Sequence, residues 1–60
     1  MTPAATLRQR LERDRAELVE MLAATPADRH LEPGFIRMLA DTHTAIAAVE
    51  AVIATKEPVP

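Results

Sequence analysis

The sequence predicts an all-α protein: an antiparallel hairpin of two long helices that dimerises into a four-helix bundle. Three observations lead there. Apolar residues recur at helical spacing in two stretches of about 22 and 25 residues. A short segment at 25–32, flanked by Pro26 and Pro33, separates them. Finally, a single domain of 60 residues without cysteine has a core worth only about 3–5 kcal/mol and no disulfide to reinforce it, so association is the expected source of further stability.

The second helix, expected over about 33–57, is the more apolar of the two. At 3.6 residues per turn its apolar band consists of Phe35, Met38, Leu39, Thr42, Ala45, Ile46, Val49, Val52 and Ile53. Alternating steps of four and three join six of these, as in a knobs-into-holes seam: Phe35, Leu39, Thr42, Ile46, Val49 and Ile53. Alanines fill much of the opposite side, so this helix is expected to have neighbours on more than one side.

The first helix is expected over about 3–24, with Thr2 as its N-cap and Pro3 at its first position. Its narrower apolar stripe is Ala4, Leu7, Leu11, Leu18, Met21 and Leu22. Continuing the steps from Leu7 and Leu11 leads to Asp14, a carboxylate in the middle of the seam. Two interpretations remain open. In the first, Asp14 pairs with Arg10 or Arg15 and selects one register or oligomeric state. In the second, the helix is rotated slightly, so Leu11 and Leu18 form the seam and Asp14 stays exposed to solvent at its edge.

The rest of the first helix is charged and offers a candidate partner surface: Arg8, Arg10, Arg13, Arg15 and Glu17. Three pairs have the i,i+4 spacing of intrahelical ion pairs, namely Arg8–Glu12, Arg10–Asp14 and Arg13–Glu17. This pattern is typical of a solvated face, and an arginine-rich recognition face is the alternative.

The connector at 25–32 begins where Pro26 forces Thr25 out of the helical region. Thr25 and Pro26 repeat the cap signal of the N-terminus, so we expect a single helical turn over 26–30. Leu31 is expected to fold under the end of the core, and 58–60 to form a frayed tail.

Side chains for catalysis or metal binding are scarce. Serine and cysteine are absent, Gly34 is the single glycine, and the two histidines belong to no Glu-x-x-His motif. We therefore expect no enzyme activity, no metal and no cofactor. One aromatic residue and a net charge of −2 disfavour base-stacking nucleic-acid modules.

The composition also favours a cytoplasmic location. The N-terminal segment has no apolar core of the kind that secretory signals need. Arg37, Asp41, His43 and Glu50 interrupt the second helix, so no membrane span is expected.

The run LRQRLERDRAELVEMLA is similar in texture to the first helix of the helical chorismate mutases, which are also dimers of long helices. Arg8 is the one residue that matches a catalytic position of that family. The second active-site arginine of that helix would fall near Thr25, where Pro26 ends the helix, and no later lysine stands in place. The resemblance therefore does not extend to the enzyme.

The expected function is that of a non-enzymatic, self-associating helical interaction or adaptor protein, with another protein as its further partner. Its expected oligomer core is Leu7, Leu11, Leu18, Met21, Leu22, Phe35, Met38, Leu39, Thr42, Ile46, Val49, Val52 and Ile53. One alternative is a small RNA- or DNA-binding regulatory dimer that uses the arginines of the first helix. Dimeric helical hairpins of plasmid copy-number control show that this architecture can bind RNA. Another alternative is an accessory subunit of a larger complex.

Overall fold

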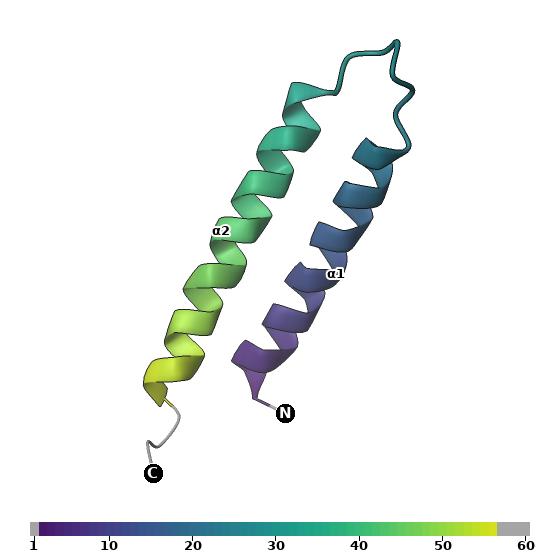
Figure 1. The fold of residues 1–60 in the computed structure, drawn as a ribbon. Coiled ribbons are helices and arrows are strands. Elements are labelled where there is room, and N and C mark those ends of the chain that lie inside the picture. Colours follow the sequence, from purple (N-terminus) through teal and green to yellow (C-terminus); the bar gives the residue numbers. More distant parts are fainter. Residues whose placement is uncertain (1, 57–60) are drawn as a thin grey trace.

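The computed structural model describes residues 2–56, which form two antiparallel α-helices lying side by side (Figure 1). Helix α1 spans Pro3–Ala23 and helix α2 spans Pro33–Lys56. The all-helical hairpin is thus confirmed, with the described helix ends within one residue of those predicted. Glu57, the expected last residue of the second helix, and the expected tail at 58–60 lie outside the described residues.

The start of α1 is capped as the sequence predicts. The hydroxyl of Thr2 accepts a hydrogen bond from the Ala5 N–H at 3.1 Å, and its carbonyl accepts one from the Thr6 N–H at 3.0 Å. Thr2 has extended backbone angles, and Pro3 follows it in the first turn, where no intrahelical N–H partner is needed.

The connector contains one tight turn. The N–H of Arg29 donates to the carbonyl of Pro26 at 3.0 Å, which closes a β-turn over 26–29, so the helical turn expected over 26–30 is not formed. Thr25 does not cap this turn, because its hydroxyl donates back to the Met21 carbonyl at 3.3 Å and so completes the end of α1. The expectation for Leu31 was wrong. Its side chain is 45% exposed and does not cover the end of the core.

The α2 side of the seam agrees with the predicted spacing. The seam positions Phe35, Leu39, Thr42, Val49 and Ile53 are half-buried, and Ile46 is buried with 3% exposure. Ala45, beside this line, is also half-buried.

The α1 side is rotated by one position from the Leu7–Leu11–Asp14 line. Its inward positions, all half-buried except the buried Leu18, are Ala4, Arg8, Leu11, Arg15, Leu18 and Leu22, and the half-buried Thr25 continues this line just after the helix. Asp14 is exposed, and Arg15 takes the central seam position that the spacing had assigned to a carboxylate. An arginine is suited to this place because its apolar stem can lie along the seam while its guanidinium reaches the edge, which the short side chain of Asp14 cannot do.

The core of a single hairpin is thin. Within residues 2–56 only Leu18 and Ile46 are buried. The molecule measures 52 × 17 × 16 Å, and its radius of gyration is 14.7 Å, against about 10 Å for a compact domain of this length. The exposed large apolar side chains, each at 45% or more, are Leu7, Val19, Met21, Leu31, Ile36, Met38 and Val52.

Candidate interaction surface

One side of the hairpin carries two parallel stripes of residues spaced seven apart. Residues with this spacing lie on nearly the same side of a helix. We call this side the heptad face and define it by Leu7, Asp14 and Met21 of α1 with Met38, Ala45 and Val52 of α2. Of these six, four are large apolar residues with 45–51% exposure, namely Leu7, Met21, Met38 and Val52.

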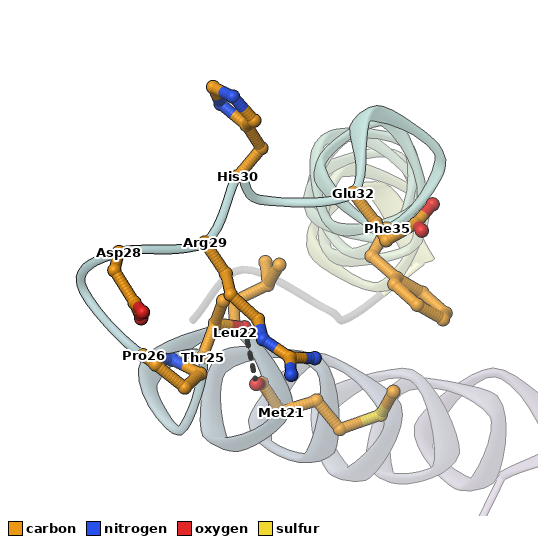
Figure 2. A pocket seen from close by; sticks show the side chains of 9 residues that line it. All are labelled: Met21, Leu22, Thr25, Pro26, Asp28, Arg29, His30, Glu32 and Phe35. Carbon is orange, nitrogen blue, oxygen red and sulfur yellow. Dashed lines mark hydrogen bonds between the residues drawn. The ribbon is translucent and has the colours of Figure 1, made fainter.

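A groove and the view from the connector place the two stripes on the same side. A shallow groove of about 260 Å³ is lined by Ala4, Leu7, Ala48, Val49 and Val52, so Leu7 and Val52 share one face at the open end of the hairpin. At the connector end, Met21 of α1 and Phe35 of α2 line the same hollow (Figure 2). Because residues seven apart keep nearly the same side of a helix, Met21 and Met38 continue the face of Leu7 and Val52 toward the connector.

The contact between the two helices uses only part of each apolar band. In α1 the band includes Leu7 and Met21, and in α2 it includes Met38 and Val52, yet all four are exposed. Because these residues lie on the same side of the seam, each apolar band extends beyond the contact between the helices onto the heptad face. Part of the apolar residues of each helix therefore packs against the other helix, and another part is exposed on the heptad face.

The opposite side holds a second groove, of about 740 Å³, which we call the histidine groove. Its lining residues are Glu12, Arg15, Ala16, Val19, Glu20, Ile36, Leu39, Ala40 and His43. At one end Arg15 Nη1 lies 3.3 Å from His43 Nδ1. Alanines and charged groups make up much of this side, and its large exposed apolar residues are Val19 and Ile36.

The connector forms a third hollow, of about 560 Å³, lined by Met21, Leu22, Thr25, Pro26, Asp28, Arg29, His30, Glu32 and Phe35. Figure 2 shows that its polar groups do not converge, because Asp28, His30 and Glu32 point in different directions. Within residues 2–56 there is no group of three or more His, Asp or Glu side chains that could hold a metal ion.

The five residues predicted as a partner surface do not share one face. Arg8 and Arg15 are half-buried along the seam, and the other three are exposed. Arg10 and Glu17 flank the heptad face, whereas Arg13 follows Leu11 by two positions, a rotation of about 200° that places it opposite the seam. No single basic patch results.

Intrahelical pairing along α1 is also sparser than expected. Arg8 Nε lies 3.6 Å from Glu12 Oε1, and both side chains are partly exposed. In the described part of the chain the expected pairs Arg10–Asp14 and Arg13–Glu17 are not formed. The partner surface predicted from these five charged residues is thus split between several sides of α1.

Helix α2 is long and apolar enough to cross a membrane by length and composition alone, with a mean hydropathy of 1.2 over its best 18-residue window. The core helices of soluble proteins pass the same test, so the expectation of no membrane span stays a prediction. Only 6% of that window is buried inside the hairpin.

No protein-family model matches the chain, and comparisons with curated proteins and with solved structures likewise find no match.

Proposed function

We propose that this chain is a non-enzymatic helical interaction protein that works as a self-associated bundle. In this assembly α2 supplies most of the shared core, and the charged side chains of α1 that stay at the surface meet a further protein. The main support for the proposal is that the apolar bands of both helices extend onto the heptad face, where their large side chains are exposed.

The accessible area supports association. A compact protein of 6.6 kDa exposes about 3,900 Å², but this chain exposes 5021 Å². The excess, about 1,100 Å², exceeds the roughly 800 Å² that each partner buries in an interface of standard size. A second copy on the heptad face would remove an area of this order from water.

A membrane is the less favoured partner for α2. Asp41 and Glu50 lie inside its apolar stretch, and an acidic side chain near the middle of a bilayer costs about 2.5–3.5 kcal/mol. A soluble, cytoplasmic bundle is the proposed state, to which the absence of cysteine is well suited. The nucleic-acid alternative is also less favoured, because the arginines of α1 are distributed over different sides of the helix.

Sedimentation of the full chain tests the proposal, with two lysine substitutions as a matched pair. Val52 and Ile36 lie on the same helix and are both 45% exposed, but Val52 belongs to the heptad face and Ile36 to the histidine groove. We expect a dimer for the unchanged chain at micromolar concentration, a monomer for Val52→Lys and a dimer for Ile36→Lys. A cooperatively folded monomer of the unchanged chain would overturn the proposal, as would equal effects of the two substitutions.

A further inference from the structure

We propose that a second copy of this chain docks on the heptad face about a two-fold axis that runs across the helices and passes between the two Asp14 side chains. Helix α1 then faces α1 of the partner in antiparallel orientation, and α2 faces the partner's α2. This inference rests on the proposed self-association and adds its geometry.

The heptad face has three layers. Leu7 and Val52 line one groove at the open end of the hairpin. Asp14 and Ala45 lie at the middle, at the level marked by the contact of Arg15 with His43. Met21 and Met38 complete the face toward the connector. Large apolar side chains therefore stand at equal distances on both sides of a middle layer made of one small and one charged residue.

Two symmetric dimers can bury this face. If the two-fold axis runs parallel to the helices, α1 lies against the partner's α2. Each layer then lies opposite the same layer of the second copy, so Asp14 of one copy faces Ala45 of the other. With the axis across the helices, the outer layers exchange, so Leu7 meets Met21 and Val52 meets Met38, while Asp14 meets Asp14 and Ala45 meets Ala45. Both dimers are closed and use the same patch on each copy.

Charge beside the face selects between them. Arg10 and Glu17 flank Asp14 at nearly equal distances along α1, and Asp41 occupies the corresponding flank of α2. An axis along the helices brings Glu17 level with Asp41 of the partner, twice, and like charges so placed repel. An axis across the helices brings Arg10 level with Glu17 of the partner, twice, and these opposite charges attract. The second arrangement also sets the two Asp14 carboxylates against each other, and the two Arg10 guanidinium groups, one helical turn away, offset that repulsion. The second arrangement is therefore favoured.

This arrangement also gives Asp14 a role. Its carboxylate faces the same group of the partner at the axis, and each Arg10 lies one helical turn away, within reach of both carboxylates. A polar residue at one interface position selects the register and oligomer at some cost in stability. A slip of two turns along the helices would set Asp14 against Leu7 or Met21, which offer it no partner.

Cross-linking of single-cysteine variants tests the axis directly, because the chain has no cysteine of its own. With a short bis-maleimide we expect Ala45→Cys, which leaves Asp14 in place, to form cross-linked dimers alone. Asp14→Cys should do so as well, although in a mixture of registers, and Arg13→Cys, opposite the seam, serves as the control for random collision. Cross-linking only in a mixture of Asp14→Cys and Ala45→Cys chains would instead show the axis along the helices and overturn the inference. A dimer that cross-links in neither way would overturn it too.

Charge exchange supplies a second measurement that leaves the middle layer unchanged. We expect Arg10→Glu and Glu17→Arg each to weaken the dimer about tenfold, and the double variant to restore its dissociation constant, with Arg13→Glu neutral. Tighter binding by Glu17→Arg alone would show that Glu17 faces Asp41 and would refute the proposed axis. These outcomes differ from a failure of self-association, in which sedimentation finds no dimer at any accessible concentration, or finds association with lipid vesicles in its place.

Discussion

Arg15 of α1 donates a hydrogen bond to His43 of α2 across 3.3 Å, and the two residues are 28 positions apart in the chain. An arginine side chain has no acceptor, so Nδ1 of His43 is the acceptor in this contact. The contact marks one level along the two helices, and Asp14 and Ala45 are one and two positions away from it in the chain. This level is the reference from which the three layers of the heptad face are counted.

A double-mutant cycle on this pair should give a coupling energy of about 0.5–1 kcal/mol, because both side chains are partly open to water. Arg15→Met keeps the apolar stem in the seam, and His43→Ala removes the acceptor. The free energy of unfolding, from urea titration followed by circular dichroism, is the quantity to measure. Arg13→Met combined with His43→Ala is the control and should be additive. Additivity of the Arg15 cycle as well would mean that the hydrogen bond contributes nothing to stability.

Ile46 is the most buried residue of the described chain, at 3% exposure, so Ile46→Ala should cost about 2–5 kcal/mol per chain. In a domain this small we expect loss of cooperative folding at modest concentration, observed as a flat thermal melt. Val19→Ala, on a side chain that is 48% exposed, is the control and should cost less than about 1 kcal/mol. Similar losses for the two variants would mean that the seam is not the core.

The N-cap of α1 offers a comparison between two threonines. Thr2 accepts from the Ala5 N–H, whereas Thr44 in the middle of α2 donates to the Ala40 carbonyl, which is already bonded within the helix. Thr2→Ala should therefore cost about 0.5–2 kcal/mol, and Thr44→Ala should be nearly neutral. Thermal unfolding at one fixed protein concentration checks both. A neutral Thr2→Ala would indicate that the first turn of α1 is frayed in solution.

Asp14→Leu should raise stability and remove the single oligomeric state. Leucine extends the apolar stripe between Leu7 and Met21 and no longer penalises a slipped register. Light scattering should then find mixed species, and the melting temperature should rise. If this variant forms one species of unchanged size, Asp14 is a surface residue only, and specificity arises from the connector or from α2.

The sequence by itself determined the elements of this protein. Thr2 and Pro3 predict the start of α1, Pro26 its end and Pro33 the start of α2, because caps and proline act on neighbouring backbone whatever the rest of the chain does. The α2 seam was predictable as well, because alternating steps of four and three through its apolar residues give a single line. That line is Phe35, Leu39, Thr42, Ile46, Val49 and Ile53.

Only the tertiary structure decided how α1 turns against that seam. The lines through Leu7 and Asp14 and through Arg8 and Arg15 differ by one position and share Leu11 and Leu18, so periodicity does not separate them. Packing does, because the inward line must lie against α2 along its whole length, and the stem of Arg15 can cross the seam while its head reaches His43. That rotation brings Leu7, Asp14 and Met21 to the outside, where they form the heptad face with Met38, Ala45 and Val52. Which residues face outward together is a property of two helices in contact, and neither helix alone contains it.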